Sequence, residues 1–163
     1  MTKLTQGDRI ALLTSGGDAP GMNAGLRAAA KIATALGLVA LGVEDGYRGL
    51  IEGRIRPLDL RALDQAARQG GTLLGSARCQ VFPTPEGQAR ARRALLDAEV
   101  RGLVVFGGNG SLTGARTLAG AETAGGAPLR VCGVLASIDN DVGCTAMAIG
   151  VDTAMNTIVD ACD

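Results

Sequence analysis

Short apolar runs alternate along the chain with longer segments of helical periodicity. Residues 9–14 (RIALLT), 38–43, 102–106 (GLVVF) and 130–135 (RVCGVL) are short apolar runs that predict strands, the first of them buried, and residues 23–36 repeat apolar positions at helical spacing. Continuous apolar runs are typical of parallel strands that are covered on both faces. Strands that alternate with helices in this way predict βαβ units, so we expect one α/β domain with an open, doubly wound parallel sheet.

The remaining helical patterns cover residues 62–69, 86–99 and 112–124 and a last segment that begins near Asp152. Residues 44–53 are rich in glycine and are predicted to form a turn-rich connection. The chain stops at Asp163 while its helical pattern continues, whereas a domain normally ends beyond a helix cap. We therefore expect this terminus to be a cut through a longer protein.

Composition restricts the chemistry. The 163 residues include 25 glycines, 16 basic and 16 acidic residues and no histidine. The commonest general base and transition-metal ligand is therefore missing, and catalysis would fall to Asp, Glu, Arg, Lys, Ser, Thr or Cys. A net charge of zero argues against a nucleic-acid partner, and no apolar run approaches the ~20 residues that cross a membrane. Four cysteines without a C-x-x-C pair indicate a reduced, cytoplasmic protein.

Three segments of unusual composition follow predicted strands: residues 15–23 (SGGDAPGMN), 107–111 (GGNGS) and 137–141 (SIDND). The carboxyl ends of parallel strands lie on one edge of an open sheet, so the three loops should converge there. Glycines in the first two loops would let backbone N–H groups approach a phosphate, although tight turns alone would also explain them. Neither loop contains the two common nucleotide-binding patterns, G-x-x-x-x-G-K-[ST] and G-x-G-x-x-G.

The third segment places two carboxylates, Asp139 and Asp141, on either side of Asn140. In an extended stretch, alternate side chains point the same way, so the two acids would share one side. They could serve as a general base and a metal-binding or positioning carboxylate. An Asx turn with a helix cap is an equally good interpretation of the same spacing.

Taken in order, five motifs resemble the N-terminal domain of ATP-dependent 6-phosphofructokinases. They are LTSGGDAPGMNAGLR (13–27), DGYRGL (45–50), QGGTLLGSAR (69–78), VVFGGNGSLTGA (104–115), and SIDND with AIGVDTA (137–154). A GG-x-G-S loop alone is shared with NAD kinases and lipid kinases, but SGGDAPGMN and SIDND count against those families. The resemblance implies a Rossmann-like nucleotide-binding and catalytic-loop domain over residues 1–163, with the second, substrate domain of the family absent from the chain.

By resemblance, the activity would be transfer of the γ-phosphoryl group of ATP to the 1-hydroxyl of fructose 6-phosphate, giving fructose 1,6-bisphosphate in glycolysis. Mg2+ would accompany ATP, and the full-length protein would be a cytoplasmic homotetramer under allosteric control, without a nucleic-acid or membrane partner. We expect this chain alone to be an incomplete enzyme. The alternative is a non-catalytic nucleotide-binding or regulatory module of the same family.

The resemblance also assigns roles to individual residues. The catalytic group consists of Gly17, Arg78, Asp139 and Asp141, with Asp139 as the base that accepts the hydroxyl proton. The nucleotide-binding residues are Gly17, Arg78, Cys79, Asn109, Gly110, Ser111 and Gly114. The substrate-binding residues are Ser137, Ile138 and Asp139.

Several positions bear on specificity and regulation. Asn109 stands where the family has an aspartate that handles Mg2+, and an amide brings an oxygen ligand but no charge, so metal binding should be weaker. Cys79 stands where an aromatic residue is usual. Gly110 goes with ATP in this family, whereas pyrophosphate-using relatives carry aspartate there. Arg27 and Lys31 occupy positions of effector-site arginines, which implies an allosteric site.

Overall fold

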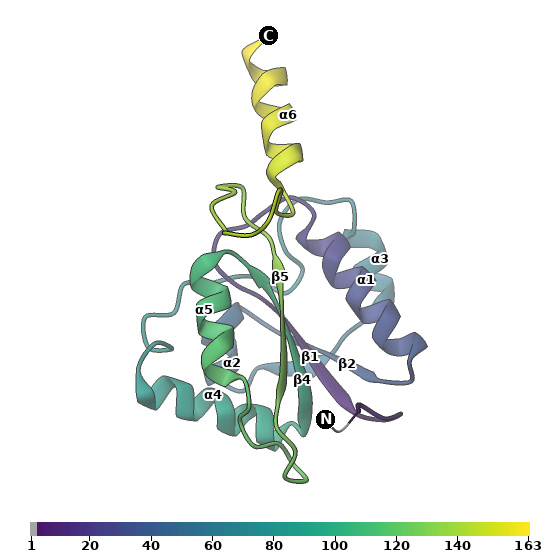
Figure 1. The fold of residues 1–163 in the computed structure, drawn as a ribbon. Helices are drawn as coiled ribbons and strands as arrows, with labels where there is room; N and C mark the ends of the chain where they lie inside the picture. Colours follow the sequence, from purple (N-terminus) through teal and green to yellow (C-terminus); the bar gives the residue numbers. More distant parts are fainter. Residues whose placement is uncertain (1–2) are drawn as a thin grey trace.

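The computed structural model describes residues 3–163 and contains a five-stranded sheet with flanking helices (Figure 1). The strands are β1 (Arg9–Thr14), β2 (Val39–Val43), β3 (Ile55–Pro57), β4 (Val100–Gly107) and β5 (Arg130–Leu135). The helices are α1 (Met22–Ala35), α2 (Gly46–Ile51), α3 (Leu60–Ala66), α4 (Pro85–Asp97), α5 (Asn109–Leu118) and α6 (Val151–Cys162). The strand order is β3-β2-β1-β4-β5, so β1 lies at the centre of the sheet.

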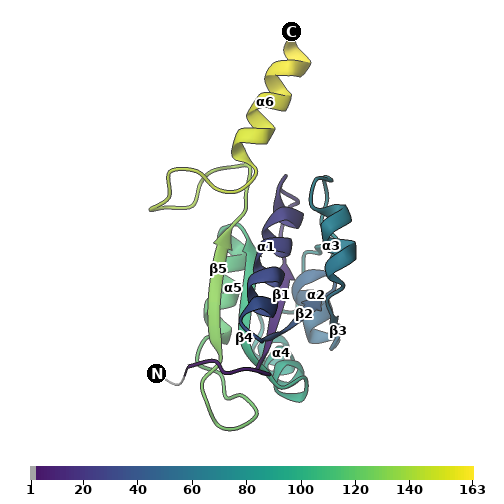
Figure 2. The same ribbon diagram turned by 90° about the vertical axis from the view of Figure 1, so that its right-hand side faces the viewer.

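Helices cover both faces of the sheet, as the doubly wound prediction requires (Figures 1 and 2). Side chains alternate across a strand, so β1 serves two cores. Ile10 and Leu12 join a cluster with Leu26 of α1 and Leu63 of α3. Ala11 and Leu13 face the opposite layer, a cluster that contains the residues Leu50 of α2, Leu95 of α4 and Leu118 of α5. Burial on both faces explains why β1 is a continuous apolar run.

The sheet is mixed rather than wholly parallel. β1 pairs in parallel with β2 and β4, and β4 pairs in parallel with β5. The added edge strand β3 runs antiparallel to β2, with Leu41 opposite Pro57. Proline has no N–H group to donate to a sheet and is therefore confined to places such as an edge strand. The open, doubly wound sheet is thus confirmed, and β3 is an additional antiparallel edge strand that was not among the predicted strands.

The largest departures from the predicted helices are at α2 and α5. Residues 44–53 were expected to be only a turn-rich connection, but they contain α2. Helix α5 begins at Asn109 rather than at residue 112, and it ends at Leu118 rather than at residue 124. Ala119 already leaves the helical conformation with ψ of 135°, and Gly120 follows with a left-handed φ of +76°. The sequence pattern missed α2 because glycine disfavours helices, and it extended α5 too far because residues 119–124 (AGAETA) remain rich in alanine.

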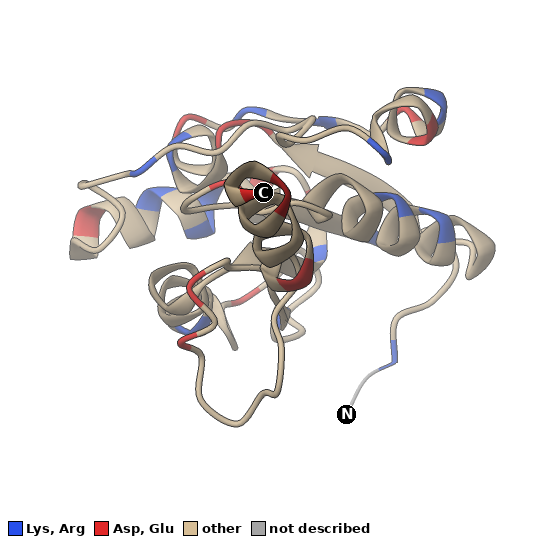
Figure 3. Ribbon diagram, turned by 90° about the horizontal axis from the view of Figure 1, so that it is seen from above, with Lys and Arg blue, Asp and Glu red and all other residues tan. Residues whose placement is uncertain are grey.

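Helix α6 projects away from the sheet in both side views (Figures 1 and 2). Val151, its first residue, is its only buried residue. Viewed along this helix, charged residues of both signs are interspersed over the ribbon (Figure 3). Within residues 3–163, no helix combines the length and apolarity needed to span a membrane.

Candidate nucleotide and phosphoryl-transfer site

The three loops that were predicted to converge surround one cavity of about 830 Å³. They follow β1, β4 and β5, three neighbouring parallel strands whose carboxyl ends share one edge of the sheet. Every residue that we predicted for catalysis, nucleotide binding or substrate binding lines this cavity. These residues are Gly17, Arg78, Cys79, Asn109, Gly110, Ser111, Gly114, Ser137, Ile138, Asp139 and Asp141.

The N-terminus of α5 opens into the cavity, because its first three residues, Asn109, Gly110 and Ser111, all line it. The N-cap residue Gly108 supplies no side-chain hydrogen bond to the first turn. The first N–H groups of a helix have no partner within the helix, and the helix dipole adds positive potential there. This end of α5 therefore suits a phosphate group.

Close packing explains one of the glycines in this loop. A Cβ atom on Gly107 would lie 2.6 Å from the Ser111 Oγ atom and 2.6 Å from the Ser15 carbonyl oxygen. Since a backbone atom cannot yield as a flexible side chain would, only glycine lets β4 turn into α5 beside the loop after β1. Gly110 is different, because a Cβ there would meet no atom within 4 Å. A side chain at position 110 would point into open space.

The acidic loop presents both carboxylates to the cavity, which Asp139 and Asp141 line and Asn140 does not. Asn140 has φ of +50°, a left-handed conformation that asparagine tolerates. Its amide donates to the Ala146 carbonyl oxygen at 3.2 Å, and its own oxygen accepts from the Ala148 N–H group at 3.0 Å. The turn at Asn140, rather than an extended strand, thus sets the direction of the two acids.

An aromatic pair that sequence reasoning missed forms another part of the cavity wall. The rings of Tyr47 and Phe82 are stacked, with centroids 3.9 Å apart and planes 19° apart. The Tyr47 hydroxyl donates to the Ser111 carbonyl oxygen at 2.6 Å, and burial raises the pKa of Tyr47 well above its usual value. The phenol therefore stays protonated as a donor. The available signal was the scarcity of aromatic residues, one tyrosine and two phenylalanines in the chain.

This pair gives Gly114 a second explanation. We expected the residue to let a nucleotide lie close to the helix. A Cβ atom at Gly114 would lie 2.8 Å from Phe82 Cε1 and 3.2 Å from two ring atoms of Tyr47. The glycine is thus already required by packing of the two rings against α5.

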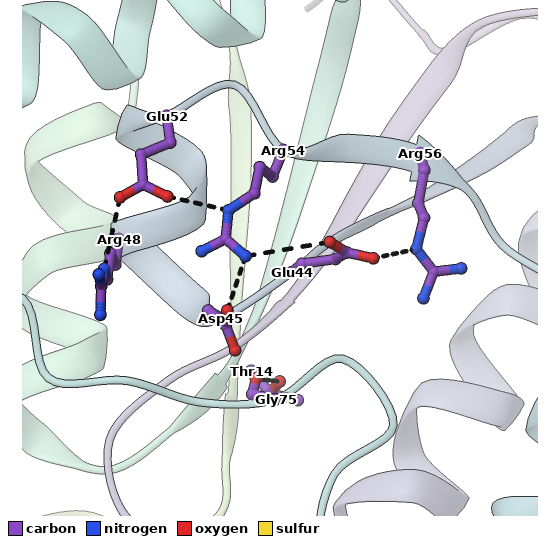
Figure 4. Close-up of polar contacts among 8 residues, drawn as sticks. All are labelled: Thr14, Glu44, Asp45, Arg48, Glu52, Arg54, Arg56 and Gly75. Carbon is purple, nitrogen blue, oxygen red and sulfur yellow. Dashed lines mark hydrogen bonds and ion pairs between the residues drawn. The ribbon is translucent and has the colours of Figure 1, made fainter.

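Polar contacts with β1 and with the residue before α2 hold the loop that carries Arg78 and Cys79 in place (Figure 4). The buried Thr14 hydroxyl donates to the Gly75 carbonyl oxygen at 2.7 Å. The Asp45 N–H group donates to the Leu74 carbonyl oxygen of the same loop at 2.8 Å, and the Asp45 carboxylate pairs with Arg54 at 2.7 Å. Arg54 also pairs with Glu52 at 2.9 Å. These contacts fix the backbone three residues before Arg78.

The charges in the cavity do not favour a bare polyanion. Asp18, Asp139 and Asp141 line it, against the single guanidinium of Arg78. A phosphate chain bound there would need further positive charge, and Mg2+ supplies such charge while being bound through one or two carboxylates together with substrate phosphates. Over residues 3–163 there is no cluster of three or more His, Cys, Asp or Glu side chains able to hold a metal by themselves. The Asp141 carboxylate fits Mg2+ only in this shared mode, because the Asn109 amide turns its nitrogen rather than its oxygen toward that carboxylate.

The two predicted effector residues lie elsewhere. Arg27 and Lys31 lie on α1 and both pair with Asp64 near the end of α3, with a distance of 2.8 Å from Lys31 Nζ to Asp64 Oδ1. Hydrogen bonds from Lys31 and then Arg27 lower the pKa of the Asp64 carboxyl. All three side chains are exposed to solvent. Neither cation belongs to the cavity.

A mostly parallel open sheet with two glycine loops, an uncapped helix N-terminus and paired carboxylates at its carboxyl edge is typical of α/β proteins that bind phosphorylated ligands. Comparison with known sequences narrows this class. The profile of the family described as Phosphofructokinase matches residues 9–163. The chain belongs to the phosphofructokinase family.

Curated relatives carry the name ATP-dependent 6-phosphofructokinase. The relative from Thermotoga neapolitana is 46% identical over 153 residues, which cover 94% of this chain and 46% of the relative. The relative from Halalkalibacterium halodurans is 46% identical over 155 residues, covering 95% of this chain and 47% of the relative. The chain thus spans about half the length of the curated relatives that it matches.

Solved structures agree with the fold. The phosphofructokinase of Pichia pastoris in the T-state superposes with a TM-score of 0.90 and 32% identity, over 99% of this chain and 18% of that chain. The phosphofructokinase of Saccharomyces cerevisiae gives a TM-score of 0.87 and 36% identity, over 96% of this chain and 23% of that chain. The pyrophosphate-dependent enzyme of Marinobacter aquaeolei, at 19% identity and a TM-score of 0.74, covers 88% of this chain and 37% of that chain and shares the fold.

Proposed function

We propose that this chain carries the nucleotide loops and the proton-accepting loop of a 6-phosphofructokinase, which transfers the γ-phosphoryl group of ATP to the 1-hydroxyl of fructose 6-phosphate. One observation carries the proposal: all the residues that the family resemblance assigns to catalysis and binding line a single cavity at the carboxyl edge of the sheet. The names of the curated relatives support ATP as the donor.

The roles follow from what phosphoryl transfer requires, which is alignment and charge stabilisation more than covalent chemistry. Backbone N–H groups at the N-terminus of α5 and at Gly17 bind the phosphates, and Arg78 adds positive charge. Asp139 accepts the proton of the attacking hydroxyl, and Asp141 lies beside it on the same loop. Ser137 and Ile138 contact the sugar phosphate.

Bound Mg2+ would add positive charge to the transferring phosphoryl group. Asp141 would supply a charged ligand, while the Asn109 amide, whose nitrogen donates to that carboxylate, adds no charge. Since aspartate is usual at position 109 in the family, the site here has one negative charge fewer, and we expect weaker metal binding.

The test is to express the protein from its whole coding sequence and to assay it for formation of fructose 1,6-bisphosphate. The wild-type protein should form product with ATP, and Asp139→Asn should reduce kcat by about 10²- to 10⁴-fold, the usual contribution of a general base. Asp152→Asn on the exposed helix α6 is the matched control and should keep wild-type activity. Absence of ATP-dependent product from the wild-type protein would overturn the catalytic assignment.

A second candidate, a non-catalytic nucleotide-binding or regulatory module, is favoured by the neutral Asn109. It predicts binding of Mg-ATP in titration calorimetry without turnover by the whole product. Measurable turnover would exclude it.

Assembly and regulation belong to the same proposal. We expect the whole protein to be a cytoplasmic homotetramer, with Arg27 and Lys31 forming part of an anionic effector site. Their pairing with Asp64 means that an anionic effector must compete with this carboxylate. Asp64→Ala should therefore strengthen effector binding, and unchanged or weaker binding would contradict this assignment.

A further inference from the structure

The side chain of Asn109 joins the two loops of the proposed active site. Its Nδ2 atom donates to the Asp141 carboxylate at 2.9 Å and lies 3.3 Å from the Asp141 carbonyl oxygen. Both partners are acceptors, so the amide nitrogen must face them and the amide oxygen must face away. The orientation of this amide therefore follows from its surroundings.

The contact lies at the distal end of the acidic loop. The proximal end is held by the backbone, where the Ala136 N–H group donates to the Gly107 carbonyl oxygen at 3.1 Å. Five residues later, Asp141 meets Asn109, the first residue of α5. Asp139 lies between these two attachments and lines the cavity. The loop is thus fastened to the β4–α5 junction at both ends.

We propose that Asn109 is a positioning residue, whose amide latches the loop of residues 137–141 onto the N-terminus of α5 without the help of a metal ion. The significance for catalysis rests on the proposed function, because the latch would keep Asp139 and Asp141 in register with phosphates bound at α5. The latch itself is a property of the protein alone.

The chemistry of position 109 explains why the latch needs an amide. A carboxylate there would lose both donated hydrogen bonds and would place two negative charges within hydrogen-bond distance. Such a pair repels unless a cation lies between its members, so the loop would be ordered only with metal bound. With Asn109, the loop is ordered in metal-free protein as well.

Hydrogen exchange measured by mass spectrometry on peptides covering residues 136–142, in EDTA and without nucleotide, tests this directly. Asn109→Ala should speed exchange about threefold to tenfold, because a partly exposed hydrogen bond to a charged group is lost. Asn156→Ala is the matched control, since Asn156 also donates its amide to an aspartate, Asp152, at 3.4 Å on the exposed helix α6. It should leave exchange in this loop unchanged.

Exchanging the partners provides the sharper test. Asn109→Asp should speed exchange in EDTA as Asn109→Ala does, and added Mg2+ should slow it again. The double variant Asn109→Asp/Asp141→Asn restores an amide and a carboxylate in reversed order, so its exchange in EDTA should return to within about twofold of the wild type. A purely global loss of stability would not be rescued in this way, and thermal denaturation of each variant measures that loss.

The latch would be overturned if residues 136–142 of Asn109→Ala exchanged at the wild-type rate, or if they exchanged fast in the double variant. These measurements need neither ATP nor turnover, so they stand apart from the proposed function, which fails if the whole product makes no fructose 1,6-bisphosphate. Where turnover is present, Asn109→Ala should lower kcat more than it raises the KM for ATP, and the opposite split would also contradict a positioning role.

Discussion

Replacing Gly114 with alanine should push apart the stacked rings of Tyr47 and Phe82. The new Cβ atom would lie 2.8 Å from Phe82 Cε1, whereas ordinary contacts begin near 3.4 Å, so the ring must move by several tenths of an ångström. Both rings are buried, at 5% and 4% exposure, and overpacking a buried site costs ~1–3 kcal/mol. Alanine recovers ~1 kcal/mol over glycine inside a helix. The net expectation is a loss of ~1 kcal/mol.

In a chain of this size, that loss lowers Tm by roughly 2–4 °C, which circular dichroism or calorimetry resolves. Gly110→Ala is the matched control in the same helix, because a Cβ there meets no atom within 4 Å and should not lower Tm. Phe82→Leu gives the new methyl group space, so a double-mutant cycle with Gly114→Ala should show favourable coupling of ~1 kcal/mol. Equal Tm values for Gly114→Ala and Gly110→Ala, or no coupling, would refute the steric explanation.

Three further outcomes are expected. Thr14→Val removes both hydrogen bonds of a fully buried hydroxyl and should lower the free energy of unfolding, measured in urea, by ~1–3 kcal/mol. A decrease of less than about 0.5 kcal/mol would be inconsistent with these bonds. The Thr5 N–H group and the Arg101 guanidinium hold the pKa of Asp8 below its usual value, so this carboxylate stabilises the fold above about pH 4 and the contribution disappears as pH falls through the lowered pKa. Asp8→Asn should therefore flatten the acidic part of a plot of stability against pH, and an unchanged plot would contradict this role. A side chain at position 110 has free space, so Gly110→Asp should keep Tm, but it places a carboxylate at the N-terminus of α5. Mg-ATP affinity measured by calorimetry should therefore fall at least about tenfold. Unchanged affinity would disprove contact of this residue with the phosphates.

The sequence was sufficient for the parts of the fold that depend on local pattern. The bounds of β1 and β5 agree with the predicted residues, because both are continuous apolar runs. Helix α2 could not be found in this way. A Cβ on Gly49 would lie 1.8 Å from the Glu44 carbonyl oxygen, and one on Gly46 would lie 2.8 Å from the Thr14 carbonyl oxygen on β1. These glycines serve close backbone approaches that exist only in the folded chain.

The candidate site likewise has features that the sequence predicts and features that it does not. Its three loops were predictable because parallel topology brings the carboxyl ends of the strands together. The shared direction of Asp139 and Asp141 was also expected, but the physical reason differs, since a left-handed turn at Asn140 replaces the assumed extended stretch. The pairing of Tyr47 with Phe82 joins elements far apart in sequence, and no periodicity marks it.

The position of Tyr47 gives the molecule an intrinsic optical reporter. The chain has one tyrosine and no tryptophan, so its intrinsic fluorescence on ultraviolet excitation comes essentially from a single phenol in the wall of the cavity. That phenol is stacked on Phe82 and hydrogen-bonded to the first turn of α5. Emission from the unlabelled protein therefore reports on the immediate surroundings of the phosphate-binding helix, with no background from the rest of the fold.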